Sequence, residues 1–90
     1  MSKYSPLKDY LQESKVGTVR LDFTEVERIL GFPLPRSAYR HAAWWSNNPS
    51  NNVMTHQWLN AGYETSSVEP SGERLVFRRR AGATAPEAPG

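Results

Sequence analysis

The sequence contains no cysteine among its 90 residues. Disulfide bonds, thiolate metal sites and thiol catalysis are therefore all excluded. It also has no apolar run close to the roughly 20 residues of a membrane-spanning helix, and its N-terminus lacks the apolar core of a signal peptide. We therefore expect a cytoplasmic protein that does not contact a membrane.

The residue types that usually carry catalysis or hold a metal are scarce and scattered. The two histidines, His41 and His56, have no second ligand at helical spacing, and no cysteine can complete a zinc site. The serines and threonines fall in expected caps, turns and polar loops, without a His–acid constellation that the sequence reveals. There is no glycine-rich phosphate loop. The sequence therefore predicts a protein that is not an enzyme and that needs neither a cofactor nor a metal.

The chain also carries little net charge. It has 11 Lys and Arg against 9 Asp and Glu, a net charge of +2, and its pI is near 9.2. That is only mildly basic for a nucleic-acid-binding protein. The last ten residues contain one acid and no base, so residues 1–80 carry a net charge of +3. We expect a single domain over residues 1–80, followed by an Ala- and Pro-rich tail over residues 81–90 that is disordered.

The strongest local pattern is the first helix of a helix–turn–helix segment, residues 23–48. Thr24 and Glu27 have the spacing of a capping box, in which the side chain of each residue accepts a hydrogen bond from the backbone N–H of the other. Apolar residues then recur at helical spacing and give this helix one apolar face. Gly31 can adopt the left-handed conformation that ends a helix. These signals predict a helix that closes at Gly31.

A rigid turn and a second helix follow. Pro33 and Pro35 cannot continue a helix, because proline lacks an N–H and disfavours helical geometry in the residue before it. Ser37 is expected to cap the second helix, which should run through Trp45. Helix, short turn and helix form the kernel of a helix-turn-helix.

The remaining segments complete an α+β pattern. The expected elements are a helix over residues 5–14, a short strand over 17–23, the two kernel helices, a polar loop over 46–52, an extra short helix over 53–61 that ends at Gly62, and a hairpin of strands 63–68 and 74–79. This order resembles that of a compact winged helix-turn-helix domain, in which the first strand completes a three-stranded sheet with the hairpin wing. The resemblance covers residues 7–80. The polar loop and the extra helix depart from it.

The chain also resembles a family of small uncharacterised bacterial proteins. The segments that carry this resemblance are Phe23, Glu27–Gly31, Leu34–Ala38, Trp44–Asn47 and Trp58–Tyr63. They span most of the domain. The resemblance implies a shared fold and implies no catalytic activity.

One stripe of arginines and asparagine suggests double-stranded DNA as the partner. Helical spacing aligns Arg36, Arg40 and Asn47 on the second kernel helix. Arginine suits guanine and asparagine suits adenine in the major groove. Strand alternation turns Arg74 and Arg78 outward on the hairpin, where they would contact phosphates. We therefore expect a small transcriptional regulator or a DNA-associated accessory protein.

Two alternatives remain open for these residues. The helix could be a solvated face whose arginines pair with Asp22, Glu25 or Glu27. The fold could also serve a protein-binding inhibitor or adaptor, such as an antitoxin or a phage- or plasmid-borne modulator. The modest charge and the extra tryptophan-bearing helix favour this second alternative. A homodimer would suit specific DNA binding, although nothing in the sequence marks its interface.

Two adjacent tryptophans are expected to play different roles. Neighbouring positions on a helix point about 100° apart, so Trp44 and Trp45 cannot face the same seam. Trp45 is assigned to the core. Trp44 is assigned to packing, against Trp58 for example, or to recognition, and Tyr39 and His41 share that assignment.

Overall fold

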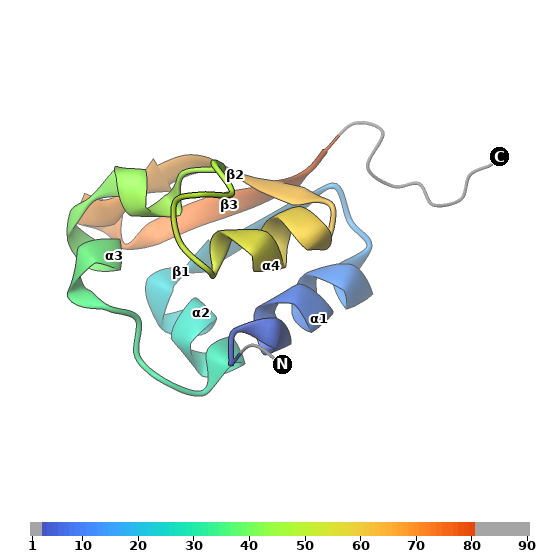
Figure 1. The fold of residues 1–90 in the computed structure, drawn as a ribbon, viewed down its shortest axis with the longest axis horizontal. Coiled ribbons are helices and arrows are strands. Elements are labelled where there is room, and N and C mark those ends of the chain that lie inside the picture. The colour runs from blue at the N-terminus through green and yellow to red at the C-terminus, as the bar shows by residue number, and fades with distance from the viewer. Residues whose placement is uncertain (1–2, 81–90) are drawn as a thin grey trace, which may run out of the picture.

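The computed structural model describes residues 3–80, which form a small α+β domain (Figure 1). Its elements are, in chain order, α1 (Ser5–Ser14), β1 (Thr18–Asp22), α2 (Phe23–Leu30), α3 (Arg36–Arg40), the 3-10 turn η1 (Ala42–Trp45), α4 (Thr55–Asn60), β2 (Tyr63–Glu69), the 3-10 turn η2 (Pro70–Gly72) and β3 (Arg74–Arg79). The predicted disordered tail, residues 81–90, lies outside the described residues. Within residues 3–80, every helix is too short or too polar to cross a bilayer.

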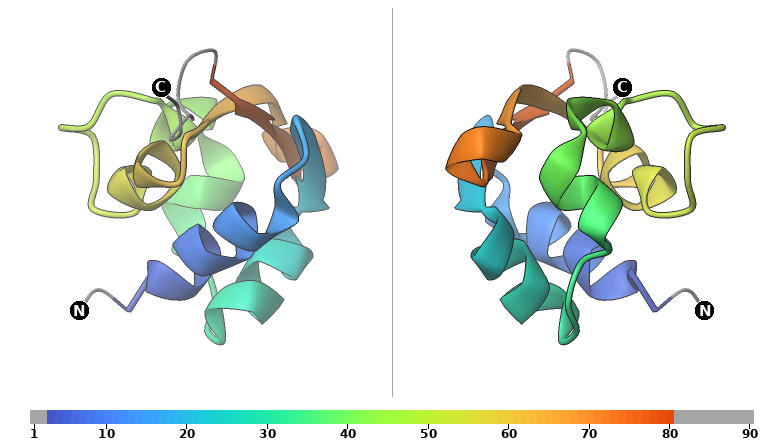
Figure 2. Two further views of the ribbon diagram at one scale, coloured as in Figure 1. Left: turned by 90° about the vertical axis from the view of Figure 1, so that its right-hand side faces the viewer. Right: turned by 90° about the vertical axis from the view of Figure 1, so that its left-hand side faces the viewer.

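The three strands form one antiparallel sheet in the order β1-β3-β2. The central strand β3 pairs with both neighbours, so that Arg78 faces Thr18 on one side and Glu64 on the other. The prediction that the first strand completes a three-stranded sheet with the hairpin is confirmed. Helices α1, α2 and α4 lie on one face of this sheet (Figure 1 and Figure 2). The opposite face, called the open face below, carries no helix in the described part of the chain.

The core between the sheet and the helices contains a row of four aromatic rings. Phe23 stacks on Trp45 with ring centroids 5.0 Å apart, and Trp45 stacks on Trp58 at 5.9 Å. Trp58 then meets Phe77 at 5.7 Å. All four side chains are fully buried, and rings of this size supply much of the apolar area that a small domain can bury. The assignment of Trp45 to the core is confirmed.

Both ends of α2 are capped by nearby residues. Asp22 Oδ1 accepts a hydrogen bond from the Glu25 N–H at 2.7 Å, and Glu25 Oε1 accepts one from the Asp22 N–H at 2.9 Å. The predicted capping box of Thr24 and Glu27 is therefore wrong. The helix starts directly from the end of β1, so the cap falls two residues earlier. Gly31 ends the helix with φ 88°, as predicted.

The predicted second kernel helix, residues 37–45, is broken. Helix α3 stops before His41, whose backbone is extended at φ −129° and ψ 117°. The physical reason lies in Trp45, whose indole Nε1 donates to the carbonyl of Ala38 at 2.9 Å. In a continuous helix that carbonyl would accept from the N–H of Ala42. The indole takes its place as the ring turns into the core.

The boundaries of α3 and α4 also differ slightly from the prediction. Helix α3 starts before Ser37, which therefore lies inside the helix rather than at its cap. The extra helix α4 is shorter than the predicted 53–61. The Asn52 Oδ1 accepts from the N–H of Thr55 at 3.2 Å and so marks its start. Gly62, with φ 87°, follows its end as predicted.

Candidate nucleic-acid interface

The two arginines of α3 lie beside the turn of the hairpin. Arg36 and Arg40 are one helical turn apart, so they share one side of the helix, and both are exposed. Helix α3 contacts η2, which Figure 2 shows at the end of the sheet next to the helix. The fold thus brings these two predicted residues near the end of β3 that carries Arg74.

Glu27 fixes the turn that leads into α3. Its Oε2 accepts hydrogen bonds from the backbone N–H of Leu34 and from the hydroxyl of Tyr39, each at 2.8 Å. The Tyr39 ring also packs edge-on against Phe23, with centroids 5.2 Å apart. Burial and then the hydrogen-bonded Glu27 carboxylate raise the pKa of Tyr39 to about 12. Of its two predicted roles, Tyr39 is engaged in packing.

Asn47 does not share a stripe with the arginines of α3, because the helix has already ended at His41. Its Oδ1 accepts from the Trp58 indole N–H at 2.9 Å, and from the N–H and hydroxyl of Thr65 at 2.8 and 3.1 Å. Its Nδ2 donates to the Thr65 carbonyl at 3.1 Å. The amide thus binds both backbone groups of a β2 residue, as a neighbouring strand would. The predicted placement of Asn47 on a DNA-facing stripe is wrong.

His41 and Trp44 flank the break after α3. The His41 side chain is exposed, and Trp44 is half-buried. The Trp44 ring packs edge-on against Trp45 with centroids 4.8 Å apart. The tight turn of η1 therefore lets the two neighbouring rings touch, whereas the helical spacing predicted that they diverge. Of its two predicted roles, Trp44 takes the packing one, with Trp45 as its ring partner.

Arg74 and Arg78 project from the open face of the sheet, as strand alternation predicts, while Leu75 and Phe77 are buried on the other face. Sequence reasoning missed a third arginine there. Arg20 of β1 is exposed and lies opposite Val76 in the sheet register. It therefore lies diagonally between the two β3 arginines. Alternation alone turns Arg20 outward, but only the register of β1 on β3 reveals its neighbours.

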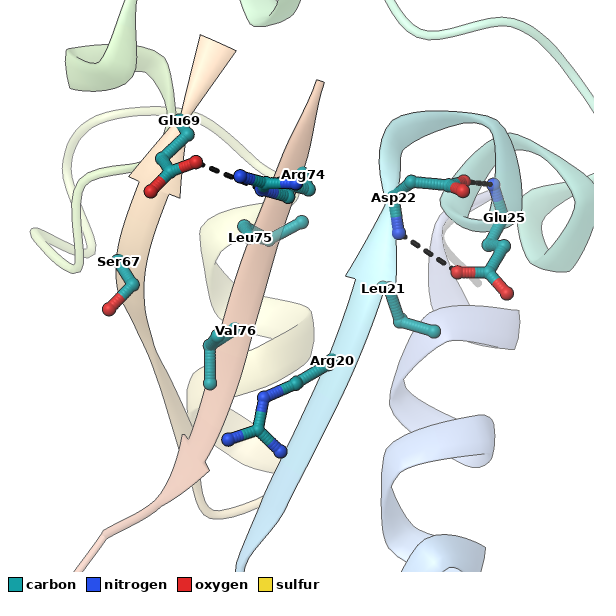
Figure 3. Close-up of a pocket in the computed structure, with 9 residues that line it drawn as sticks. All are labelled: Arg20, Leu21, Asp22, Glu25, Ser67, Glu69, Arg74, Leu75 and Val76. Carbon is teal, nitrogen blue, oxygen red and sulfur yellow. Dashed lines mark hydrogen bonds and ion pairs between the residues drawn. The ribbon is translucent and has the colours of Figure 1, made fainter. Parts of the chain in front are cut away.

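A pocket of about 320 Å³ lies on the open face around Val76 (Figure 3). Charged side chains from all three strands line it, including Arg20, Asp22, Glu69 and Arg74. The Arg74 Nε is 2.9 Å from the Glu69 Oε1, and Asp22 caps α2. In Figure 3 the Arg20 side chain extends from β1 toward β3 without such a bond. Arg20 is thus the one side chain of these four that is drawn with no ionic or hydrogen-bonded partner.

Most of the exposed arginines lack an acidic partner within residues 3–80. The ion pairs within residues 3–80 join Arg74 to Glu69 at 2.9 Å and Arg80 to Glu64 at 4.0 Å. The arginines of α3 therefore do not pair with Asp22, Glu25 or Glu27, as one interpretation of the sequence expected. Together with Arg20 and Arg78, they form no ion pair with a described carboxylate, although Glu64 lies opposite Arg78 in the sheet register.

Comparison with protein families places the chain in one of them. The family described as a domain of unknown function (DUF7662) matches residues 4–81. Because this match covers most of the chain, the protein belongs to that family. The expected resemblance to an uncharacterised family is confirmed in this form. Comparisons with the curated proteins and with the solved structures found no significant match.

Proposed function

We propose that this member of the DUF7662 family binds double-stranded DNA without catalysing a reaction, as a small transcriptional regulator or a DNA-associated accessory protein. The observation that supports this most is the set of unpaired arginines on α3 and β3. Arg36, Arg40 and Arg78 have no acidic partner within residues 3–80. They can contact phosphate oxygens without first breaking an ion pair, and phosphate contacts supply most non-specific DNA affinity.

The proposal includes a winged helix-turn-helix-like use of the fold. Helix α2, a short turn and α3 follow one another in the order of that motif. The hairpin of β2 and β3 would act as the wing. Its turn contacts α3, so a duplex that lay against α3 would also come near Arg74. Arg78 lies about 13 Å further along β3, since a strand rises about 3.3 Å per residue.

The length of α3 limits how much sequence this surface can recognise. Its five residues span about 7.5 Å of helix axis at 1.5 Å per residue. Recognition helices place several base-contacting side chains in the major groove, and here the Asn47 amide is already occupied by hydrogen bonds to Trp58 and Thr65. We therefore expect affinity to come mainly from phosphates and discrimination between bases to depend on Arg40.

A salt titration of DNA binding tests the proposal. The affinity of the full chain for a fluorescein-labelled random 20-base-pair duplex would be measured by anisotropy at several salt concentrations. About four arginine contacts predict a slope of log affinity against log salt between −3 and −4. Arg78→Ala should weaken binding to all sequences and reduce the slope by about one. Arg40→Ala should also erode base discrimination, by about 1–3 kcal/mol at one base pair.

Arg28→Ala is the matched control, because Arg28 lies in the groove between α1 and α2 rather than near α3 or the hairpin. It should leave both affinity and slope nearly unchanged. Absence of binding to any duplex at low salt would refute the DNA proposal. An effect of Arg28→Ala as large as that of Arg78→Ala would show that only net charge matters.

A second candidate function is binding to a protein partner, as an inhibitor or adaptor. The short α3 and the net charge of only +3 over residues 1–80 favour it, because both reduce what the fold can offer to DNA. A protein that failed the duplex titration at low salt would belong to this second class.

A further inference from the structure

The β2 edge of the sheet is closed to further strands. The Asn47 side chain binds both the N–H and the carbonyl of Thr65 there. The pairing of β2 with β3 is also irregular between Ser66 and Glu69. Irregularities and covered backbone groups of this kind keep another strand from pairing with an edge. The β2 edge is therefore blocked near its middle.

The β1 edge lacks these features. Strand β1 contains no proline, and it pairs with β3 without a register shift. Gly17 and Phe23, at either end of β1, both form hydrogen bonds toward the β3 side. Hydrogen bonding alternates along an antiparallel pair, so the backbone groups of Thr18 and Arg20 point away from β3. Within residues 3–80, neither residue makes a backbone hydrogen bond on this outer side.

Apolar surface gathers beside the β1 edge. Among the described residues, the exposed large apolar side chains are those of Tyr10, Val16 and Val53. Val16 is 51% exposed and comes just before β1. Tyr10 is 40% exposed, and with Leu21 of β1 and Ile29 it lines a groove of about 240 Å³ between α1 and α2. The loop that contains Val53 lies on the side of the domain away from β1 (Figure 2). A strand added to β1 would therefore cover two of these three side chains.

The charged groups along this edge differ in sign between its two ends. Lys15 precedes β1, whereas Asp22 ends the strand and Glu25 follows in the first turn of α2. None of the three forms an ion pair within residues 3–80. Arg20, between them, extends toward β3 and not toward the edge (Figure 3). Two such edges that pair antiparallel place the basic end of each beside the acidic end of the other, so the edge is complementary to a second copy of itself.

We propose that two copies of this protein pair through their β1 edges, so that their sheets join into one antiparallel sheet across a two-fold axis. Thr18 of each copy would exchange backbone hydrogen bonds with Arg20 of the other. This register keeps the two Arg20 side chains from lying directly opposite each other, where like charges are destabilising. It also sets Val16 opposite Asp22 of the other copy. The pairing would end there, because the Glu25 carboxylate already binds the Asp22 N–H.

A second copy suits the edge because it brings the same unpaired backbone groups. In a two-fold interface the same patch is used on both copies, so a single contact satisfies both edges and covers both apolar grooves. The ladder is short, and the dimer should therefore form only at raised protein concentration. The contact leaves Arg36 and Arg40 of α3 free, so the inference does not depend on DNA binding.

Two measurements on the full chain without DNA test the pairing. Sedimentation velocity over a roughly hundredfold range of protein concentration should show a monomer–dimer equilibrium. Amide hydrogen exchange of the ¹⁵N-labelled protein, followed by NMR on the same samples, locates the interface. Exchange of the Thr18 and Arg20 amides should slow as the dimer fraction rises, because both gain backbone hydrogen bonds. The Thr65 amide on the other edge, which already binds Asn47, should not change.

Three variants of exposed valines test the register. Val16→Asp places a carboxylate opposite Asp22 of the other copy, and it should raise the dimer Kd about tenfold, because the change occurs on both sides of the two-fold axis. Val16→Lys offers the opposite charge to the same Asp22 and should weaken the dimer much less. Val53→Asp is the matched control. It makes the same change at an exposed valine away from β1 and should leave the dimer Kd unchanged.

A fourth variant tests the backbone pairing itself. Thr18→Pro removes an outward N–H that does not bond to β3, a change that an edge strand tolerates. It should weaken the dimer about tenfold, because each copy loses one hydrogen bond of the ladder. It should also abolish the concentration-dependent protection of the Arg20 amide. If Thr18→Pro does not fold, the comparison of Val16→Asp with Val53→Asp decides the result.

Three outcomes would overturn the proposal. The first is a protein that stays monomeric over the whole concentration range. The second is a dimer in which exchange of the Thr18 and Arg20 amides is unchanged, which would place the interface on another surface. The third is protection of these amides that is the same at every concentration, which would show that the same chain covers the edge. Since no DNA is present, each of these results leaves the DNA-binding proposal to its own titration.

Discussion

Helix α2 and the segment from residue 41 to 54 are close in sequence, but they are held in place by different means. The ends of α2 are closed by Asp22, Glu25 and Gly31, all within or next to the helix. The 41–54 segment combines hydrogen bonds within itself with hydrogen bonds to other elements. Its Trp45 binds the carbonyl of Ala38, and other members bind residues of α4 and β2.

The asparagines of this segment account for much of the difference. A chain without regular structure must still satisfy its buried backbone N–H and carbonyl groups. Asn51 and Asn52 donate to the carbonyl of Trp44 at 2.9 and 3.0 Å, and Asn47 binds Thr65 and Trp58. An asparagine-rich stretch that looks like a solvated loop in sequence thus serves as the scaffold between η1, α4 and β2.

The largest expected effect is on Trp45. Trp45→Ala should lower the free energy of unfolding by about 3–5 kcal/mol, the usual cost of removing a large buried aromatic side chain. It would empty the space between Phe23 and Trp58 and free the carbonyl of Ala38. Urea denaturation measures the loss. Trp44→Ala, at a half-buried ring, should cost less than half as much, and a loss below about 1 kcal/mol for Trp45→Ala would contradict its place in the core.

Asn47→Ala should follow, lowering the free energy of unfolding by about 2–4 kcal/mol, because it removes the partner of the Trp58 indole N–H and of the Thr65 backbone N–H and carbonyl. The Thr65 hydroxyl keeps its hydrogen bond to the Trp45 carbonyl. Asn48→Ala is the matched control. Asn48 is exposed and its side chain serves a local turn, so its loss should be about 0.5 kcal/mol. Equal losses in the two variants would show that Asn47 is not a scaffold residue. Thermal or urea unfolding decides between these results.

Asp22→Ala tests helix α2, whose ends are capped by nearby residues. It should lower the free energy of unfolding by about 1 kcal/mol, the typical contribution of an N-cap side chain. Thr24→Ala, at the residue first predicted to cap α2, should change stability by less than about 0.5 kcal/mol. The two urea midpoints compare the two capping boxes directly. A larger loss of stability for Thr24→Ala than for Asp22→Ala would support the capping box of Thr24 and Glu27 that the sequence predicts.

An effect of similar size, which depends on pH, concerns the turn between the two kernel helices. The pKa of Tyr39 is raised from 10.0 to about 12 in the folded protein, so the folded state holds this proton more tightly than the unfolded state. The stability from the Tyr39 hydroxyl is therefore fully present below pH 10 and is lost as pH rises toward 12. Tyr39→Phe should be less stable than wild type at neutral pH by about 1 kcal/mol. That difference should shrink between pH 10 and 12 in matched denaturation curves, and a constant difference would contradict the bond to Glu27.

The sequence by itself determined the elements whose signals are local. Pro6 near the start of α1, Gly31 after α2 and Gly62 after α4 act on the backbone at their own positions, so their effects do not depend on the rest of the fold. Period-two alternation turns Arg74 and Arg78 outward for the same reason. The order of helices, the hairpin and the outward β3 arginines could all be predicted from these signals.

Only the tertiary structure decided the break at His41, the hydrogen bonds that Asn47 makes to α4 and β2, and the neighbours of Arg20. A continuous helix through Trp45 has no local defect, and it breaks because burying the Trp45 ring against Phe23 and Trp58 outweighs one helical hydrogen bond. Asn47 finds its partners on α4 and β2, and Arg20 gains its neighbours through the register on β3. Each of these outcomes depends on contacts between segments far apart in sequence. A local sequence pattern does not contain the energies of such contacts, so it could not predict them.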